Sequence, residues 1–253
     1  MVTSMEILEE LTAMKDVSQA GHLMRFFKCG VGEYGYGDRF LGLKVPQTRM
    51  IVKAAGHDVP LGEIEKLLYS EWHEARLCGF LLLVEEMKAA LPRRNDIPVR
   101  GAERRDELAA FYLRHARQAN NWDLVDLSCP KILGEWLLHP QSDGGLPSRD
   151  ILDQLACSSN LWEQRIAIVT TLRLIKEGRF DDTLRIAAKF LSHPHDLIHK
   201  ATGWMLREVG KKDERTLASF LEENYARMPR TTLRYAIERM DEADRRYWLM
   251  RKS

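Results

Sequence analysis

The sequence lacks the features that mark secreted, membrane-inserted and zinc-binding proteins. Its 253 residues include only four cysteines, and no C-x-x-C pair occurs among Cys29, Cys78, Cys129 and Cys157, so neither a disulfide framework nor a zinc ribbon is encoded. No apolar run approaches a membrane span of ~18 residues, and the first residues are acidic and periodic where a signal peptide is basic and then apolar. We therefore expect a cytoplasmic protein in a reducing compartment, with no membrane partner, no metal and no other cofactor.

An excess of one charge is also absent overall, because the formal net charge is +1. The average conceals a gradient. From Lys200 to Ser253 there are 13 Lys or Arg against 9 Asp or Glu, a net of +4, which leaves −3 for the remainder. Two interpretations stay open: a modest basic surface that binds nucleic acid, or solvated helix faces of mixed charge.

Segments with the period-two pattern of strands are missing as well. Apolar residues recur instead at helical spacing almost throughout, as in residues 77–87 and 166–175. Prolines stand near expected helix starts, where a missing N–H costs nothing. With a hydrophobic fraction of 45%, the chain can build a sizeable core. The sequence therefore predicts an all-α fold.

A glycine-rich run, Gly30–Gly37, satisfies the pattern G-x-G-x-x-G of dinucleotide-binding loops. Such a loop must follow a buried strand and open a helix. Here AGHLMRFFK upstream is typical of a helix end, and the next helix begins only near Pro46. We interpret the run as a compact loop between two helices, with Tyr34, Tyr36 and Phe40 packing it down.

Basic residues recur near the start of successive second helices. Arg165, Lys200 and Arg234 are spaced by 35 and then 34 residues, and Arg76 has a similar context. This period predicts one domain over residues 1–253, a curved α-solenoid of HEAT-like helix pairs, that is, an α-α superhelix. Its concave face would present a row of cations suited to a polyanion such as DNA. Alternatively, each cation bonds the neighbouring repeat.

The segment QANNWDLVDLSCPKILGEWLL, residues 118–138, is the richest in candidate chemistry. Asn121 can cap a helix in which Trp122 and Asp126 lie four residues apart on one face, so an indole and a carboxylate share a pocket. The helix dipole explains Asp123. Asp126 lies near apolar residues, where a carboxylate is costly without a role or a partner, and a structural salt bridge is the competing interpretation.

Trp204 follows Lys200 by one helical turn on an expected inner helix. The plain interpretation of a tryptophan between Ala201 and Met205 is that it belongs to the core. Its functional interpretation depends on its company with the Trp122 and Asp126 motif.

The sequence resembles the AlkD-type DNA alkylation repair glycosylases, which are built of HEAT-like repeats. Four stretches carry the resemblance through most of the chain: GEYGYGDRFLGLKVPQTR, NWDLVDLSCPKILGEWLL, SSNLWEQRIAIV and HKATGWMLRE. The first corresponds to a loop between helices in that family. The resemblance thus implies that the glycines belong to a repair-protein loop and not to a nucleotide site.

The resemblance implies roles for the residues at which the motifs match. Trp122, Asp126, Arg165 and Trp204 occupy the positions of the family's catalytic-site residues. Asn121 stands where a well-known member has another tryptophan, which leaves the lesion range in doubt. The aromatic residues that members use near His195 and Leu197 are also unmatched.

The implied activity is that of a monofunctional DNA glycosylase in base excision repair. It hydrolyses the N-glycosidic bond of cationic N3- or N7-alkylated purines in duplex DNA while the lesion stays stacked. We expect a monomer, nucleoid-associated when bound to DNA. The expected DNA-binding residues are Arg76, Lys200, Arg207, Lys211, Lys212, Arg230 and Arg234. Two alternatives remain, a non-catalytic DNA-structure binder and a HEAT-type protein-interaction scaffold, and the preferred lesion stays open.

Overall fold

A computed structural model describes residues 2–57 and 59–251 of the protein. The chain forms two compact units. Unit 1 comprises Met1–Ile132 and His139–Leu146, and unit 2 comprises Leu133–Leu138 and Pro147–Ser253. That residues 1–253 form a single repeat domain therefore stays a prediction. Each unit is described by itself.

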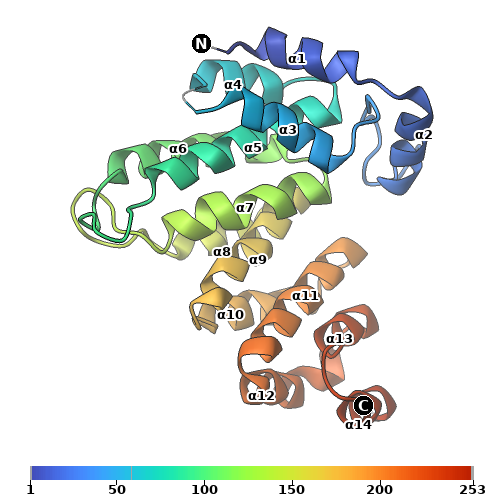
Figure 1. Ribbon diagram of the computed structural model, residues 1–253. Coiled ribbons are helices and arrows are strands. Elements are labelled where there is room, and N and C mark those ends of the chain that lie inside the picture. Colours follow the sequence, from blue (N-terminus) through green and yellow to red (C-terminus); the bar gives the residue numbers. More distant parts are fainter. Residues whose placement is uncertain (1, 58, 252–253) are drawn as a thin grey trace. The chain divides into compact units, whose positions relative to one another are not determined.

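Unit 1 consists of helices joined by loops (Figure 1). In chain order they are α1 (Ser4–Ala13), α2 (Val17–Phe26), α3 (Val45–Ala55), α4 (Leu61–Leu68), α5 (His73–Ala90), α6 (Ala102–Arg114), a 3-10 turn (Ala116–Gln118) and α7 (Trp122–Trp136), whose last residues belong to unit 2. The 18-residue helix α5 is buried along most of its length and packs against α3, α4 and α6. Apolar residues occur on every side of this helix, and a helix of that kind is stable only where other helices surround it.

Unit 2 is also helical. Its helices are α8 (Asp150–Ala156), α9 (Leu161–Lys176), α10 (Asp181–Phe190), α11 (Asp196–Lys212), α12 (Glu214–Asn224), a 3-10 turn (Tyr225–Arg227), α13 (Arg230–Ala236) and α14 (Glu242–Met250). Within the described residues no strand forms, only an isolated bridge between Arg39 and Trp72 in unit 1. None of the described helices is long and apolar enough to cross a membrane.

The predicted repeat is confirmed in the helix starts of unit 2. Helices α9, α11 and α13 begin at residues 161, 196 and 230, which are 35 and 34 residues apart. Each has its basic residue at the fifth position, namely Arg165, Lys200 and Arg234. Helix α11 packs against both α9 and α13. Helices α9 and α11 also pack against the helices that precede them, α8 and α10. The all-α fold of helix pairs is therefore confirmed.

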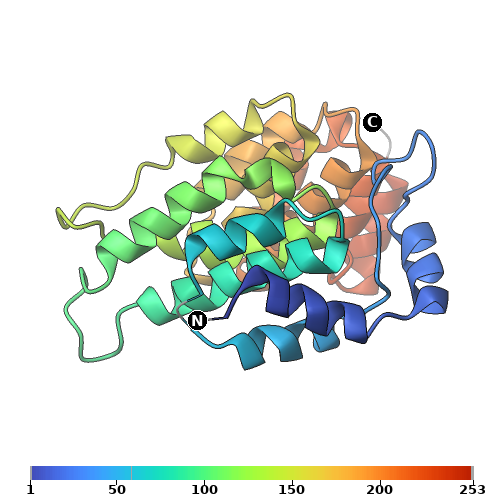
Figure 2. The same cartoon turned by 90° about the horizontal axis from the view of Figure 1, so that it is seen from above.

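The glycine-rich segment is a long loop between α2 and α3, as expected, and it runs beside α2 in Figure 2. Phe40 is buried and anchors the loop. The prediction that Tyr36 packs the loop down is wrong, because its side chain is 67% exposed. Gly42 has φ +102, and a Cβ there would meet the backbone oxygen of Asp16 at 2.0 Å, so only glycine fits this close approach.

Candidate functional site in unit 1

The first two turns of α7 carry the candidate catalytic pair. Asn121, which is fully buried, directly precedes the helix, and its Oδ1 accepts a hydrogen bond of 2.9 Å from the backbone N–H of Trp122. Trp122 and Asp126 are each half-buried. Both line one cavity of about 350 Å³. The predicted pairing of an indole and a carboxylate on one pocket is thus present within unit 1.

Aromatic rings form much of the wall of this cavity. Trp122 stacks on Phe27 with ring centroids 5.1 Å apart, and Phe26 meets Trp122 edge-on at 5.8 Å. Phe27 in turn stacks on Phe40 at 5.1 Å. The remaining lining residues are Leu23, Leu43, Lys44, Val45, His73, Glu74, Leu77, Asp123, Asp126 and Leu127. The cavity therefore combines apolar and aromatic surface with a few carboxylates.

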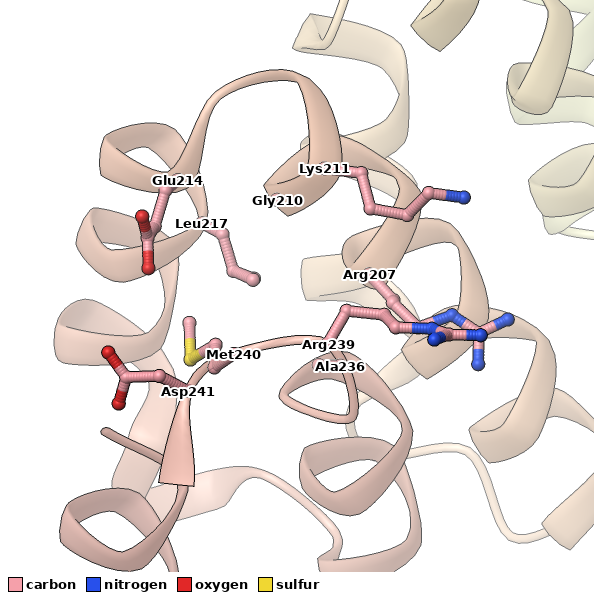
Figure 3. Close-up of a pocket in the computed structure, with 9 residues that line it drawn as sticks. All are labelled: Arg207, Gly210, Lys211, Glu214, Leu217, Ala236, Arg239, Met240 and Asp241. Carbon is pink, nitrogen blue, oxygen red and sulfur yellow. The ribbon is translucent and has the colours of Figure 1, made fainter. Parts of the chain in front are cut away.

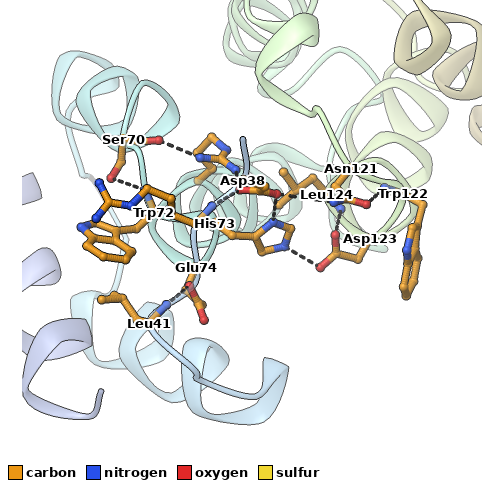
Figure 4. A network of polar contacts seen from close by, with 12 residues as sticks. Asp38, Leu41, Ser70, Trp72, His73, Glu74, Asn121, Trp122, Asp123 and Leu124 are labelled. Atoms are coloured by element: carbon orange, nitrogen blue, oxygen red, sulfur yellow. Dashed lines mark hydrogen bonds and ion pairs between the residues drawn. The ribbon is translucent and has the colours of Figure 1, made fainter. Parts of the chain in front are cut away.

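A buried polar network lies behind the aromatic wall (Figure 4). His73, the first residue of α5, uses Nδ1 to contact Asp38 Oδ2 at 2.8 Å and Nε2 to contact Asp123 Oδ2 at 2.9 Å. Arg76 donates to the other Asp38 oxygen, and the side-chain amide of Asn121 donates to Asp38 Oδ2 at 3.4 Å. The network therefore ties the glycine-rich loop, α5 and the start of α7 to one another.

The geometry fixes the protonation state of His73. An ionised carboxylate can only accept hydrogen bonds, so two carboxylates on the two ring nitrogens require a proton on each nitrogen. Burial opposes this charge, but Asp123 and Asp38 outweigh it and raise the pKa of His73 to about 9. The pKa of Asp38 is lowered, because bonds and charges from His73 and Arg76 overcome its burial. At neutral pH the imidazolium is the stable form.

Sequence patterns assigned these network residues a simpler role or none. The helix dipole alone does not explain Asp123, because its Oδ2 also binds His73. His73 and Asp38 were not singled out at all. A signal for them exists, since His73 follows Trp72 at a helix start and Asp38 ends the glycine run, but the loop that brings them together is not encoded in any local period.

Glu74 is a second buried anchor for the loop. Its carboxylate accepts three backbone N–H bonds, from Leu41 at 2.9 Å, from Gly42 at 2.8 Å and from Leu43 at 3.0 Å. Figure 4 shows it on the side of α5 that faces Leu41. These bonds satisfy a carboxylate that is only 2% exposed, as burial requires. Glu74 therefore holds the segment between the glycine run and α3.

Arg76 does not lie where a DNA contact requires it. The residue is 5% exposed, and its guanidinium bonds Asp38 and the backbone oxygen of Ser70, the latter at 2.8 Å. The alternative interpretation of the recurring cations, that they bond within the protein, holds at this position. We therefore leave Arg76 out of the proposed DNA contacts.

Arg165 and Trp204 belong to unit 2. Arg165 is 5% exposed, and its Nη1 donates to the backbone oxygen of Leu197 at 2.8 Å, in the first turn of α11. Trp204 is half-buried on the same helix. Lys200 pairs with Asp196 at 2.7 Å. Arg165 thus joins α9 to α11, which is the bond between repeats that the sequence left as an alternative.

The other predicted DNA contacts are more accessible. Arg207 pairs with Glu238, Lys211 with Glu208 at 2.6 Å, and Arg230 donates to the backbone oxygen of Leu249 at 3.0 Å. Lys212 and Arg234 are exposed, and the side chain of neither forms a hydrogen bond or salt bridge with another described residue.

A second cavity, of about 260 Å³, lies in unit 2 (Figure 3). Arg207, Lys211 and Arg239 extend toward one side of it, and Glu214 and Asp241 lie on the other. Arg239 is therefore a cation near two predicted DNA contacts that the sequence did not single out. Across residues 2–57 and 59–251, no group of three or more His, Cys, Asp or Glu could hold a metal ion.

The structure describes an all-α protein of helix pairs, with an indole and a carboxylate on one aromatic cavity. Residues 7–240 match the family described as DNA alkylation repair enzyme, and the chain belongs to this family. A solved structure described as a predicted DNA alkylation repair enzyme from Enterococcus faecalis is similar, with a TM-score of 0.65 and 18% identity over 90% of this chain and 97% of that one. No curated protein matches. The fold is shared, and the family assigns the chain a role in the repair of alkylated DNA.

Proposed function

We propose that the protein is a monofunctional DNA glycosylase that hydrolyses the N-glycosidic bond of N3- or N7-alkylated purines in duplex DNA. The observation that carries this proposal is the placement of Trp122 and Asp126 on one cavity of unit 1. Membership in the DNA alkylation repair enzyme family supplies the reaction context. The resemblance of the W-D-x-V-D motif to that of the AlkD-type glycosylases supplies the reaction type.

One carboxylate suffices for this chemistry. Alkylation at N3 or N7 makes the purine cationic, so it can leave with the electrons of the glycosidic bond and become neutral without a strong general acid. Positive charge develops on the deoxyribose as that bond stretches. The Asp126 carboxylate stabilises this charge and orients water, whose oxygen bonds to C1′ while its proton passes to the carboxylate or to solvent.

Trp122 contributes the face of its indole. An electron-rich ring attracts a cation with about 0.5 to 2 kcal/mol, depending on how far water is excluded. The stacking of Trp122 on Phe27 fixes the orientation of this ring. The resemblance gives Trp204 the same role. The DNA contact that it implies for Arg165 requires this 5% exposed guanidinium to leave the Leu197 carbonyl. Selectivity for charged lesions follows from both the carboxylate and the rings.

The resemblance also supports recognition without base flipping. The lesion then stays in the stack and the protein grips its sugar and the backbone around it, unlike glycosylases that extrude the base into a closed pocket. A 2-aminopurine placed next to the lesion reports this directly. Its fluorescence is expected to stay quenched on binding, whereas extrusion of the neighbouring base would raise it.

Binding rests on phosphate contacts from six basic residues: Lys200, Arg207, Lys211, Lys212, Arg230 and Arg234. Such contacts release counterions and are indifferent to sequence, so the affinity falls steeply with salt. Asp196 and Glu238, the partners of Lys200 and Arg207, are exposed carboxylates, which a phosphate can replace at little cost. Glu208, the partner of Lys211, is 17% exposed.

The decisive experiment is base release from a duplex that carries N7-methylguanine, followed by chromatography of the free base. Wild-type protein is expected to release the base, and Asp126→Asn is expected to slow release by about a hundredfold or more, since a placed charge is worth ~3 kcal/mol of barrier. Asp181→Asn, an exposed carboxylate in the first turn of α10, is the matched control. No release by wild type, or equal release by Asp126→Asn, refutes the assignment.

A non-catalytic DNA binder is the second candidate. The commitment of Arg165 to the Leu197 carbonyl favours it over the enzyme, because the resemblance gives Arg165 a catalytic role that this bond opposes, whereas the cations Lys200 and Arg207 can bind phosphate without Arg165. Salt-sensitive duplex binding without base release would establish this alternative. A protein-interaction scaffold would show neither property.

A further inference from the structure

Asp38, His73, Arg76, Asn121 and Asp123 form one buried polar cluster that joins the glycine-rich loop, α5 and the start of α7. We propose that His73, as an imidazolium, is the positioning residue that holds Trp122 and Asp126 in place, and that the glycine-rich loop serves to deliver Asp38 to it. This inference rests on the proposed glycosylase function and deepens it. His73 is not a catalytic residue, since both of its ring nitrogens are occupied by carboxylates.

The charges of the buried cluster balance one another. His73 and Arg76 supply two positive charges, and Asp38 and Asp123 supply two negative ones, all in side chains at most 6% exposed. Removing one partner of such a cluster leaves an uncompensated buried charge. The cluster is therefore stable as a whole and intolerant of partial loss, which makes it a stiff anchor.

His73 is connected to both candidate catalytic residues, Trp122 and Asp126. Asp123 stands directly after Trp122 and one helical turn before Asp126, so its bond to His73 fixes the rotation of the first turn of α7. Phe27 packs on both His73, at 5.0 Å, and Trp122, at 5.1 Å, so the indole is held through its ring stack as well. One side chain thus acts on the two candidate catalytic residues by two routes.

The glycine-rich loop places the carboxylate of Asp38 against the His73 ring. Gly37 has φ +86, in the left-handed region that favours glycine, and directly precedes Asp38. The side chain of Asp38 is 2% exposed although the loop around it is mostly exposed. Phe40 then stacks on the His73 ring, with centroids 4.3 Å apart. The glycines allow the chain to turn inward and place a carboxylate on His73.

The test uses a deletion and a geometric rescue. In His73→Gln, the amide can donate to Asp38, but its oxygen faces the Asp123 carboxylate and repels it. Adding Asp123→Asn replaces that acceptor by an N–H donor, so the neutral pair rebuilds the chain of hydrogen bonds. Tyr36→Ala is the control, because Tyr36 lies on the same loop and is exposed.

Single-turnover base release at pH 7 and binding to a duplex with an abasic-site analogue are measured on folded protein, verified by circular dichroism. His73→Gln is expected to slow release by roughly tenfold to a hundredfold, the cost of a small misplacement, with less than about a threefold loss of affinity. The double variant recovers most of the rate. A folded His73→Gln that keeps the wild-type rate, or a double variant without recovery, overturns the proposal.

The pH profile separates positioning from general stability. The charged groups around His73 are Asp38 from the loop, Glu74 and Arg76 from α5, and Asp123 from α7, with Lys44 and Asp126 on the shared cavity. The rate of base release by wild type, after subtraction of the base loss measured without protein, is expected to fall as the pH rises through about 9, where His73 loses its proton. The double variant is expected to stay flat there, and a common decline in both contradicts the proposal.

Failure of the inference and failure of the proposed function have different signatures. Long-range ¹H–¹⁵N correlation NMR spectra of protein labelled with ¹⁵N-histidine report the protonation state of the imidazole ring and do not depend on enzymatic activity. Wild type is expected to show His73 with both nitrogens protonated at pH 7, and Asp38→Asn to lower its pKa. A neutral His73 sinks the inference alone, whereas an intact imidazolium with no base release from wild type sinks the glycosylase.

Discussion

The two units hold their charges in different ways. In unit 1, Asp38, His73, Arg76 and Asp123 are buried together and paired with one another. In unit 2, the ion pairs Arg149–Asp182 and Arg173–Glu135 have side chains that are 15% to 24% exposed. The side chains of Arg185, Lys200 and Lys211 are between 41% and 50% exposed. A buried cluster fixes geometry at a high cost of disruption, whereas surface pairs exchange partners freely. We infer that unit 1 is built to position reacting groups and unit 2 to bind a mobile polyanion.

Replacement of one arginine in each unit should give the largest contrast. Arg76→Ala leaves the buried Asp38 with half of its cationic partners, so we expect a loss of about 3 kcal/mol or more in the free energy of unfolding. Arg185→Ala also removes an arginine with two carboxylate partners, Asp153 and Asp182, but at the surface, and should cost no more than about 1 kcal/mol. Urea unfolding of the two variants measures the difference. Equal losses would mean that burial does not distinguish the units.

A pair of glycines tests the loop against a free turn. Gly42→Ala must strain a residue at φ +102 and push its Cβ against the Asp16 oxygen, so we expect a loss of about 3 kcal/mol. Gly178 of unit 2 has φ +72, and no atom lies within 4 Å of the position that a Cβ would take, so Gly178→Ala should cost about 1 kcal/mol, the left-handed backbone alone. Thermal unfolding monitored by circular dichroism gives both values, and a milder effect at Gly42 would show that the loop yields.

The pH dependence of stability should follow the buried histidine. The pKa of His73 is raised from 6.5 to about 9 in the folded protein, so its contribution is fully present below about pH 6.5 and is lost as the pH rises through about 9. Asp38 has a lowered pKa, so its contribution is present above 3.8 and is lost as the pH falls further. Denaturant unfolding between pH 6 and 10 should show a decline that His73→Gln lacks. A parallel decline in the variant would point to other groups.

The sequence predicted the fold and the placement of Trp122 and Asp126 on one cavity. Helical periodicity and the spacing of Arg165, Lys200 and Arg234 were sufficient for the helix pairs, because both are local or repeating signals. The pairing of Trp122 with Asp126 followed from a separation of four residues on one helix. Both inferences need only the geometry of an α-helix.

The buried network could not be predicted in the same way. His73 lies 35 residues after Asp38 and 50 residues before Asp123. The three residues come from a loop and two helix starts, and no periodicity relates them. Arg76 shows the same limit, since an arginine near a helix start looks alike in sequence whether it faces solvent or a buried aspartate. Only the path of the glycine-rich loop decides between these interpretations.

The smallest effects on stability are expected at the exposed cations of unit 2, which makes them a clean probe of DNA binding. The side chains of Lys212 and Arg234 form no hydrogen bond or salt bridge with another described residue, so their replacement leaves no unpaired group behind and should change stability by less than about 0.5 kcal/mol. Each phosphate contact contributes about one to the slope of log affinity against log salt. Lys212→Ala and Arg234→Ala should each lower that slope by about 1 in duplex-binding titrations, while Lys53→Ala, an exposed cation of α3 in unit 1, should leave it unchanged. A slope that responds to Lys53 and not to Arg234 would place the polyanion on unit 1 and reverse the division of labour between the two units.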